Sequence, residues 1–537
     1  MRFADTIVPR RPDWSALRAE FRWPETPVFN IATACCDRWA RQDPGRLALV
    51  VPDPERRVTF GEMGALANRF ANVLAAQGFK NGDRLAILLP QSVEVMVCHF
   101  GILKNAGVAL PLFTLFGEDA LEFRLADSGA KGIVTDRANL PKVAAIADRL
   151  PDLRHIWCVD GAEGLARDFA ADLARAKDSF RTLPTRPSDP ALLVYTSGTT
   201  GPPKGALHGH RVLIGHLPCT ETSHDFFPQT GDLGWTPADW AWMGGLMNIA
   251  MPCLYYGVPV VAHRMGKFDP EAAHHLIACQ RVRNAFLPPT ALKLMRQVPA
   301  PQSSPLRSVA SGGEALGADT FEWAREALGL TINEIYGQTE CNLVLGNSAG
   351  VFAPRAGSMG RENPGAEVTV LDAQGHPVAA GVEGEIAIHR DHGGMFLGYW
   401  RNDEKTAAKF AGPWMRTGDV GLRDEAGYFW FSSRDDDVIS SGGYRIGPTE
   451  IETCLTGHEA VVMAAVVGVP DPLRGQVVKA FVVLASGVSR EGLSHTLIEL
   501  VKARVSPHVA PRRMEFVDSL PMTATGKIMR RDLRERG

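Results

Sequence analysis

The chain has 537 residues, of which 45% are apolar and 22% charged, and its formal net charge is −3. This composition is typical of a globular protein that is long enough for several hydrophobic cores. The small net charge, without a basic stripe or tail, argues against a nucleic-acid partner. No apolar run has the length of a membrane-spanning helix, no secretory signal is evident, and the nine scattered cysteines form no C-x-x-C pair. We therefore expect a cytoplasmic protein.

Strand-like and helix-like segments alternate through most of the chain. Apolar runs at 84–89, 107–112 and 132–135 predict buried strands, and residues 93–105 predict a helix. This alternation is typical of an α/β architecture with largely parallel sheets. A proline-rich break at 184–190 precedes a further short strand at 191–194.

A glycine-rich loop follows that strand, with the sequence Tyr195-Thr-Ser-Gly-Thr-Thr-Gly-Pro-Pro-Lys-Gly205. Its glycines allow the backbone to approach an anion closely, and Lys204 adds a positive charge. It is not a Walker A loop, because Lys204 is followed by glycine where that motif has serine or threonine. The loop predicts binding of nucleotide phosphates, but alone it does not separate phosphoryl transfer from AMP transfer.

Four later segments carry further polar motifs: Glu334-Ile-Tyr-Gly-Gln-Thr-Glu340, Thr417-Gly-Asp419, Ser440 to Glu450, and Pro521 to Arg530. A short charged break at 432–437 separates the last hundred or so residues from the rest. Strand-like runs at 461–469 and 478–484, with helical patterns between and after them, predict a small α+β domain there.

Together and in this order, these segments resemble the adenylate-forming enzymes: acyl-CoA synthetases, adenylation domains of peptide synthetases and luciferases. The similarity runs from about Phe60 to the C-terminus and is greatest to medium-chain acyl-CoA synthetases. It implies an α/β fold with a large N-terminal domain of three subdomains, namely two αβαβα-type sheets and a distorted β-barrel. A small α+β C-terminal domain would rotate about a hinge. We expect domains at 1–435 and 436–537, with the hinge at Asp436.

The resemblance also implies a role for each motif residue. ATP phosphates would be bound by Thr196, Ser197, Gly198, Thr199, Thr200, Gly201, Pro202, Pro203 and Lys204. The adenine and α-phosphate would be lined by Gly313, Glu314, Ala315, Glu334, Ile335, Tyr336, Gly337, Gln338 and Thr339. Asp419 and Arg434 would bind the ribose, Glu340 would hold Mg²⁺, Arg445 would face phosphate, and Lys527 would enter the site during adenylation.

The chemistry suits these residue types. A carboxylate that attacks the α-phosphorus brings two anions together, so the reaction depends on positioning and on cations that neutralise developing charge. Lys527, Mg²⁺ and Arg445 would supply this charge, and no general base is needed because a carboxylate is ionised near neutral pH. The acyl-adenylate would then meet a thiol, once rotation of the small domain has moved Lys527 away.

The resemblance favours CoA as the thiol. Contacts to CoA are implied for Gly442, Gly443, Tyr444 and Arg474. The chain departs from close relatives at three positions. Ser433 replaces their usual glycine, Gly442 replaces a serine, and Val509 replaces a lysine that contacts CoA in some of them. A stand-alone adenylating domain that serves a carrier protein, and an aryl-CoA ligase, stay open as alternatives. Asp239 is the one candidate near the pocket for pairing the ammonium of an amino acid.

Position 337 is informative about the acid. Acetyl-CoA synthetases carry tryptophan at this position, and we expect Gly337 to leave that space open for a longer chain. Trp235 and Trp242 would border the acyl pocket, although tryptophan clusters are also typical of plain core. The predicted substrate is an apolar monocarboxylic acid of short to medium length.

Two further interpretations concern Lys527. Its surroundings resemble the acetylation context of bacterial acyl-CoA synthetases, which predicts a lysine acetyltransferase as a partner. A non-catalytic nucleotide sensor on this fold would be expected to lack Lys527, Glu340 or the glycine-rich loop, and all three are present.

Overall fold

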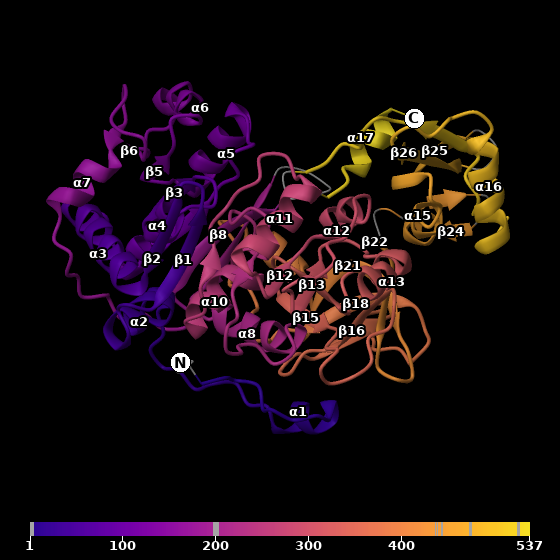
Figure 1. Ribbon diagram of the computed structural model, residues 1–537, viewed down its shortest axis with the longest axis horizontal. Coiled ribbons are helices and arrows are strands. Elements are labelled where there is room, and N and C mark those ends of the chain that lie inside the picture. The colour runs from indigo at the N-terminus through magenta and orange to yellow at the C-terminus, as the bar shows by residue number, and fades with distance from the viewer. Residues whose placement is uncertain are drawn as a thin grey trace.

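Three β-sheets organise the chain (Figure 1). The computed structural model describes residues 5–196, 203–434, 437, 439–441, 444–471, 475–507, 509–523 and 527–536. For Ser440, Tyr444, Arg445 and Gly475 it describes the backbone alone. Two sheets form a large N-terminal body, and the third forms a smaller body at its end, which confirms the predicted mixed α/β fold with a small C-terminal domain.

The first sheet contains the glycine-rich segment's two flanking strands. Its strand order is β19 (Gly398–Tyr399), β9 (Lys204–Gly209), β8 (Pro190–Thr196), β4 (Val108–Pro111), β3 (Arg84–Leu88), β5 (Gly132–Thr135), β6 (His155–Cys158) and β7 (Arg167–Asp168). Strands β3, β4 and β5 pair in parallel, which confirms the three strands predicted from their apolar runs. Strands β8 and β9 pair antiparallel, with Thr196 opposite Lys204, and residues 197–202 between them lie outside the described residues.

Helices cover this sheet: α3 (Phe60–Ala76) packs through one apolar face, whereas α4 (Val93–Lys104) is buried almost all round. In α3, the buried Met63, Ala67, Phe70 and Leu74 recur at helical spacing, and a capping box between Thr59 and Glu62 begins the helix. It packs against α4, the helix predicted at 93–105. The other helices of this region are α2 (Arg38–Gln42), α5 (Glu118–Ser128), α6 (Leu140–Ala144) and α7 (Phe169–Arg175), with a π-helical turn at Thr33–Asp37 and a 3₁₀ turn at Ala147–Arg149.

The second sheet runs through the middle of the large body. Its order is β17 (Val368–Leu371), β18 (Gly384–His389), β21 (Trp414–Arg423), β22 (Phe429–Arg434), β16 (Ser358–Glu362), β15 (Asn342–Gly346), β14 (Ile332–Gln338), β13 (Ser308–Gly312), β12 (Asn284–Phe286), β10 (Gly234–Trp235), β11 (Val260–Val261), β1 (Leu47–Pro52) and β2 (Glu55–Thr59), and β20 (Phe410–Ala411) pairs with β21. Strands β14, β13, β12, β10 and β11 pair in parallel, whereas strands from β15 to β17 pair antiparallel. The antiparallel strands, where the resemblance implies a distorted β-barrel, are thus continuous with the parallel half through the β14–β15 pair.

Further helices lie beside this second sheet. They are α8 (Val212–Ser223), α9 (Met243–Gly245), α10 (Met251–Tyr256), α11 (Pro270–Gln280), α12 (Pro289–Met295), α13 (Ala318–Ala327) and α14 (Asp403–Ala408), with a π-helical turn at Leu246–Ala250. Among the helices of the described ranges, none combines the length and apolar character needed to cross a bilayer.

The C-terminal body has its own sheet and core. Its strand order is β24 (Tyr444–Ile446), β23 (Ile439–Ser441), β26 (Gly475–Leu484) and β25 (Val461–Asp471), with β27 (Arg513–Phe516) beside β26. Helices α15 (Pro448–Thr456) and α16 (Leu493–Arg504) bury Ile451, Leu455 and Leu497 against Val466 and Ala480, and α17 (Arg530–Glu535) ends the chain. This separate core fits a domain that moves as a unit. Asp436, the expected hinge, lies outside the described residues.

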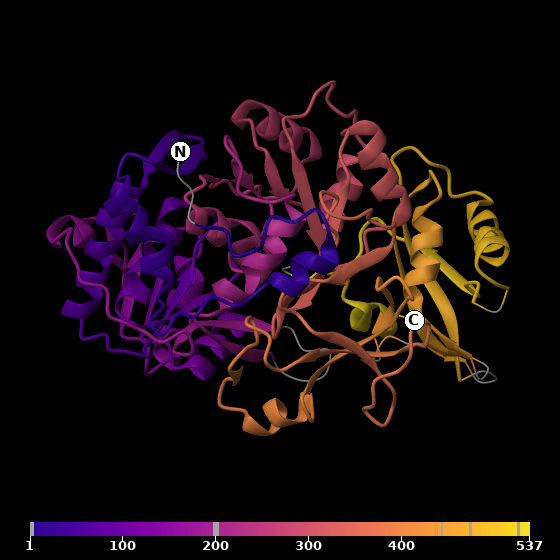
Figure 2. The same cartoon turned by 90° about the horizontal axis from the view of Figure 1, so that it is seen from below.

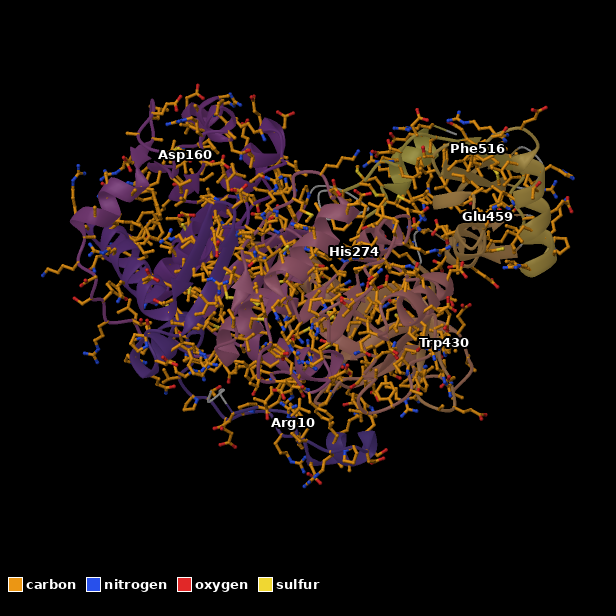
Figure 3. The ribbon with its side chains drawn as sticks, in the orientation of Figure 1. Arg10, Asp160, His274, Trp430, Glu459 and Phe516 are labelled. Atoms are coloured by element: carbon orange, nitrogen blue, oxygen red, sulfur yellow. The ribbon has the colours of Figure 1, made fainter. Side chains whose placement is uncertain are left out.

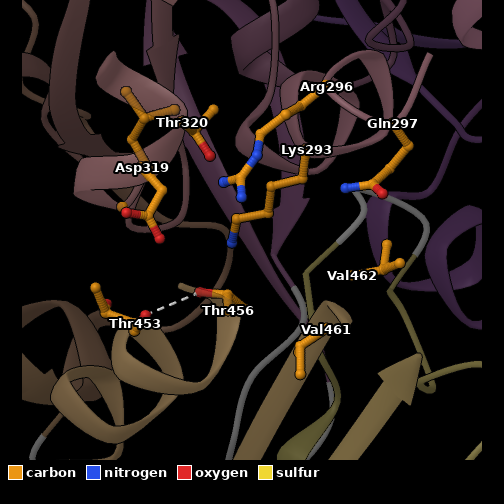
Figure 4. A pocket seen from close by; sticks show the side chains of 11 residues that line it. Lys293, Arg296, Gln297, Asp319, Thr320, Thr453, Thr456, Val461 and Val462 are labelled. Atoms are coloured by element: carbon orange, nitrogen blue, oxygen red, sulfur yellow. Dashed lines mark hydrogen bonds between the residues drawn. The ribbon is translucent and has the colours of Figure 1, made fainter. Parts of the chain in front are cut away.

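The two bodies face each other across a small pocket (Figure 4). Lys293 of α12, Arg296 at the C-cap of that helix and Asp319 of α13 line it from the large body, and Thr453 and Thr456 of α15 line it from the small one. Charged and hydroxyl side chains thus line this part of the interface together with the apolar Leu316, Val461 and Val462.

An N-terminal segment crosses the outside of the large body (Figure 2). It carries α1 (Trp14–Glu20), whose Trp14 and Leu17 pack against Phe352 and its neighbours. Glu221 of α8 holds the segment: its carboxylate accepts hydrogen bonds from the backbone N–H of Ile7 (2.8 Å) and Val8 (3.2 Å) and from the Tyr256 hydroxyl. Burial raises the pKa of Glu221 to about 7. Arg10, labelled in Figure 3, donates to the carbonyls of residues 226 and 227.

Candidate active site

Asp419, from the 417–419 motif, contacts two side chains of the 334–340 motif and one from the charged break at 432–437. Its Oδ2 accepts hydrogen bonds from the Tyr336 hydroxyl and from Gln338 Nε2, both at 2.7 Å. Its Oδ1 lies 3.1 Å from Nη1 of Arg434, which is the residue opposite it in the β21–β22 ladder. Tyr336 and Gln338 are two residues apart on β14, so their side chains share one face of that strand.

The site around Asp419 is buried and preorganised. Asp419 is 5% exposed, and burial, followed by the nearby Asp419 charge, raises the pKa of Tyr336 well above its ordinary value. Tyr336 therefore stays a hydrogen-bond donor, and the carboxylate is held by charge-assisted bonds in one orientation. A fixed carboxylate of this kind is suited to accept hydrogen bonds from the hydroxyls of a ribose.

Glu340 lies at the end of the same strand and connects it to the lysine of the glycine-rich loop. Its Oε1 accepts a hydrogen bond of 2.6 Å from the Tyr399 hydroxyl, and Nζ of Lys204 lies 5.1 Å from the centre of the Tyr399 ring. Burial lowers the pKa of Lys204, with further contributions from Lys405 and Lys409, whereas Glu340 raises it. Thr339, between Gln338 and Glu340, is half-buried.

Lys405 and Lys409 belong to none of the sequence motifs, and the sequence analysis did not identify them as site residues. Lys405 lies in α14, Lys409 caps its C-terminus, and Lys409 Nζ donates to the Thr417 carbonyl at 3.4 Å. The signal available was their spacing of four residues on a helix, which places them on one face. They add positive charge beside Lys204, next to the place where an anionic phosphate chain is expected.

Lys527 comes from the small domain and lies against the loop that follows β13. A Cβ placed on Gly313 would be 4.0 Å from Cε of Lys527 and 3.3 Å from the Trp242 ring. Gly313 has φ of +102°, a conformation that glycine adopts readily and that lets this loop pass closely between the two side chains. Burial raises the pKa of the neighbouring Glu314, whereas Lys293, Lys527 and Arg530 lower it. The structure thus brings Lys527 to the expected adenine-lining residues 313–315.

Glu334 and Ile335 support this loop from behind. Glu334 is 5% exposed and its Oε1 accepts a hydrogen bond of 3.3 Å from the backbone N–H of Leu316, directly after Ala315. Burial raises the pKa of Glu334 to about 7. Ile335 points into the hydrophobic core, so it is the backbone of this position that could line a nucleotide.

Two expectations about the acyl pocket are wrong. A Cβ on Gly337 would lie 1.7 Å from the carbonyl oxygen of Asn342, so this glycine is required by close contact within the β14–β15 hairpin and leaves no open space. Trp235 is fully buried in the core beneath the parallel strands and is not a pocket wall. Trp242 is half-buried and lies beside Gly313, which keeps it as the candidate wall.

For the remaining predicted residues the structure gives few contacts. Thr196 Oγ1 donates to the Lys204 carbonyl at 3.4 Å, and Pro203 is half-buried. Outside the described residues lie Ser197, Gly198, Thr199, Thr200, Gly201, Pro202, Asp436, Gly442, Gly443 and Arg474. The side chains of Tyr444 and Arg445 lie outside them as well.

Comparison with known protein families gives one match in each of the two bodies of the chain. The family model "AMP-binding enzyme" matches residues 36–400, and the model "AMP-binding enzyme C-terminal domain" matches residues 450–527. The mitochondrial acyl-coenzyme A synthetase ACSM3 of Mus musculus is 32% identical, covering 98% of this chain and 93% of that protein. The acetyl-coenzyme A synthetase of Bacillus subtilis is 35% identical with the same coverage.

The fold also matches solved structures over nearly its whole length. The anthranilate CoA ligase AuaEII in complex with anthranoyl-AMP superposes with a TM-score of 0.89 at 28% identity, covering 95% of this chain and 98% of that chain. The two family models together span more than half of the chain, and they fall on the two bodies that meet at Lys527. The chain belongs to the AMP-binding enzymes, that is, to the adenylate-forming superfamily, close to the medium-chain acyl-CoA synthetases.

Proposed function

We propose that the chain is an ATP-dependent acyl-CoA synthetase. It activates an apolar carboxylic acid of short to medium length as acyl-AMP and then transfers the acyl group to the thiol of CoA. The single observation that carries this proposal is the meeting of Lys527 with the loop at Gly313. This loop follows β13, which pairs with β14, and Tyr336 of β14 binds Asp419. The relatives that are acyl-CoA synthetases by name support the same reaction class.

In the first half-reaction the residues would orient ATP and neutralise charge. Asp419 would accept the ribose hydroxyls, which fixes the nucleotide at one end. Lys204, with the segment between β8 and β9, would bind the pyrophosphate end that leaves. Lys527 would then lie near the α-phosphate, where negative charge develops as the substrate carboxylate attacks.

Glu340 fits a magnesium ligand in its donor chemistry. One carboxylate oxygen is bound by Tyr399, and the other accepts no hydrogen bond from the residues that the structure describes. Mg²⁺ in nucleotide sites is commonly held by one or two carboxylates together with phosphate oxygens. Among the described residues there is no cluster of three or more His, Cys, Asp or Glu that could hold a metal ion. A bound Mg²⁺ would supply charge neutralisation for the phosphates.

The second half-reaction rests on residues whose roles stay predictions. These are Gly442, Gly443, Tyr444 and Arg474 for CoA, Arg445 for phosphate and Asp436 for the hinge between domains 1–435 and 436–537. The separate hydrophobic core of the small domain supports a movement as one unit, which would withdraw Lys527 and admit the thiol.

An aryl-CoA ligase is the second candidate, and one observation favours it. Trp242 packs beside Phe286 with ring centres 5.7 Å apart and borders Gly313, so an aromatic acid could stack there. The similar structure of an anthranilate CoA ligase is in line with this reading.

A panel of acids tests the proposal and separates these candidates. Acetate, butyrate, hexanoate, octanoate, benzoate and anthranilate are each incubated with ATP and Mg²⁺, and ATP–pyrophosphate exchange is measured without CoA. Thioester formation is then measured with CoA. We expect exchange without CoA and thioester only with it, strongest for butyrate to octanoate. Benzoate or anthranilate as the best substrate would select the aryl-CoA ligase. If none of the acids supported ATP–pyrophosphate exchange, the proposal would be rejected.

Two lesser predictions accompany this function. Acetylation of Lys527 by a lysine acetyltransferase would remove its charge and stop adenylation, which mass spectrometry of the acetylated protein and its exchange rate would test. Full exchange by fully acetylated protein would contradict it. The cytoplasmic location also stays a prediction, which fractionation of the source cells would test.

A further inference from the structure

Arg530 forms the centre of an ion-pair network just after Lys527. Its Nη2 lies 2.9 Å and 2.7 Å from the two carboxylate oxygens of Glu452, and its Nη1 lies 3.4 Å from Oδ2 of Asp437. The Arg530 side chain is 21% exposed, whereas that of the adjacent Arg531 is 72% exposed. Arg530 is therefore a largely buried fork that joins two carboxylates, and Arg531 is an ordinary surface residue.

Asp437 connects this network to the large domain. Its backbone N–H donates a 3.0 Å hydrogen bond to the carbonyl of Arg434, the residue whose guanidinium binds Asp419. Its carboxylate also pairs with Arg534 of α17 and is 9% exposed. Asp437 directly follows the expected hinge residue, so contacts made through it span the point where the two domains join.

The network is also tied to the turn that carries Lys527. In that turn the N–H of Thr523 donates to the Lys527 carbonyl at 2.7 Å, and the N–H of Met529 donates to the Pro521 carbonyl at 2.8 Å. Arg530 begins α17 immediately after it. Backbone hydrogen bonds and one arginine thus connect the Lys527 turn to Asp437, and Asp437 to the ribose site.

Across the domain interface, Lys527 lies against Gly313, the residue before Glu314, and the charges of the same cations act on Glu314. Lys527 and Arg530 of the small domain and Lys293 of the large domain lower its pKa against the effect of burial. The orientation in which Lys527 reaches the active site therefore also brings Arg530 towards a carboxylate of the large domain. Rotation of the small domain would separate these charges.

We propose that Arg530 is a positioning residue for adenylation: its fork between Glu452 and Asp437 fixes the Lys527 turn relative to the hinge. The inference rests on the proposed function, because it assigns Lys527 to the first half-reaction. A guanidinium can bind two carboxylates in a fixed plane, which the single ammonium of a lysine cannot do. Arg530→Lys therefore keeps the charge and removes the geometry.

The test measures the two half-reactions separately in Arg530→Lys and Arg530→Met. Because a misplacement of about 1 Å can cost about 100-fold in rate, we expect ATP–pyrophosphate exchange to fall about tenfold in Arg530→Lys and about 100-fold in Arg530→Met. Thioester formation from supplied acyl-adenylate and CoA should change by no more than about twofold, because Lys527 is not needed there.

Controls distinguish positioning from loss of the fold. Arg531→Gln is the matched neighbour and should leave both half-reactions unchanged, and thermal unfolding checks that each variant is folded. Equal loss of both half-reactions, or unchanged exchange in both Arg530 variants, would overturn the inference while leaving the proposed function intact. Absence of exchange in the unaltered protein would instead remove the proposed function, and this inference with it.

Discussion

The ribose side of the site and the Lys527 side are built in opposite ways. Asp419 is buried and held by Tyr336, Gln338 and Arg434, all from one continuous sheet of the large domain. Lys527 is exposed, and its side chain makes no hydrogen bond to any residue in the described part of the chain. The proposed ribose site is thus fixed in advance, whereas the charge that we propose for adenylation is carried by a separate domain. This arrangement suits an enzyme that must retain AMP through two steps and use Lys527 in one of them.

The largest effect should come from removing the delivered charge. In Lys527→Ala we expect ATP–pyrophosphate exchange to fall by about 100- to 1,000-fold, because a cation aimed at developing charge is lost. Thioester formation from supplied acyl-adenylate should be retained. Measuring both half-reactions checks this, and equal loss of both would show that Lys527 is not confined to the first.

Substitution of the fixed carboxylate should instead affect both steps. In Asp419→Asn the charge-assisted bonds become neutral ones, and a loss of about 1.5–3 kcal/mol would weaken nucleotide affinity about 10- to 100-fold. Isothermal titration with AMP and the KM for ATP measure this effect, and Asp424→Asn, at an acid in the turn that joins β21 to β22, serves as a control. If AMP affinity were unchanged, the ribose assignment would be wrong.

The third effect is on stability rather than on activity, and it concerns the pH response of Glu221 in α8. Its pKa of about 7 lies above the value of about 4.3 for an unfolded glutamate, so the folded protein binds more protons between these values. Its contribution is therefore most favourable at low pH, and stability falls as pH rises from about 4.5 to 7, by up to about 3 kcal/mol.

Thermal unfolding of the protein and of Glu221→Gln between pH 5 and 8 tests this sign. The variant should lose less stability over that range, because the glutamine side chain does not titrate. Buried His208 and His216, with pKa values lowered by burial to about 3, act in the opposite sense below pH 6.5 in both proteins. Parallel pH curves for the two proteins would contradict the role given to Glu221.

Local sequence signals predicted a large share of the fold and site. The strands at 84–88, 108–111 and 132–135 contain enough consecutive apolar residues to be predicted without knowledge of tertiary contacts. The motif residues Tyr336, Gln338, Asp419 and Arg434 do meet in space, as their shared resemblance implies. These motifs allow site residues to be predicted because each combines a particular local backbone conformation with one functional side chain.

The errors concern residues whose role depends on tertiary packing. The sequence analysis predicts that Gly337 leaves space for the acyl chain. In the structure a side chain at this position would instead clash with the Asn342 carbonyl across the bulged β14–β15 hairpin. Nothing near Arg530 in sequence indicates that Asp437 and Glu452 lie beside it, since both partners are more than seventy residues away. The spacing of Lys405 and Lys409 indicates a shared helix face, but their proximity to Lys204 follows only from the packing of α14 against β19 and β20.

The continuity of the second sheet has a consequence for the growing chain. Strand β14 reaches β21 only through β15, β16 and β22, which are hydrogen-bonded in that order. Asp419 and its partner Arg434 therefore cannot meet Tyr336 until the chain has been synthesised past residue 434. During translation the first sheet can already be folded while the proposed ribose site has yet to form, so this site would be completed only with the large domain.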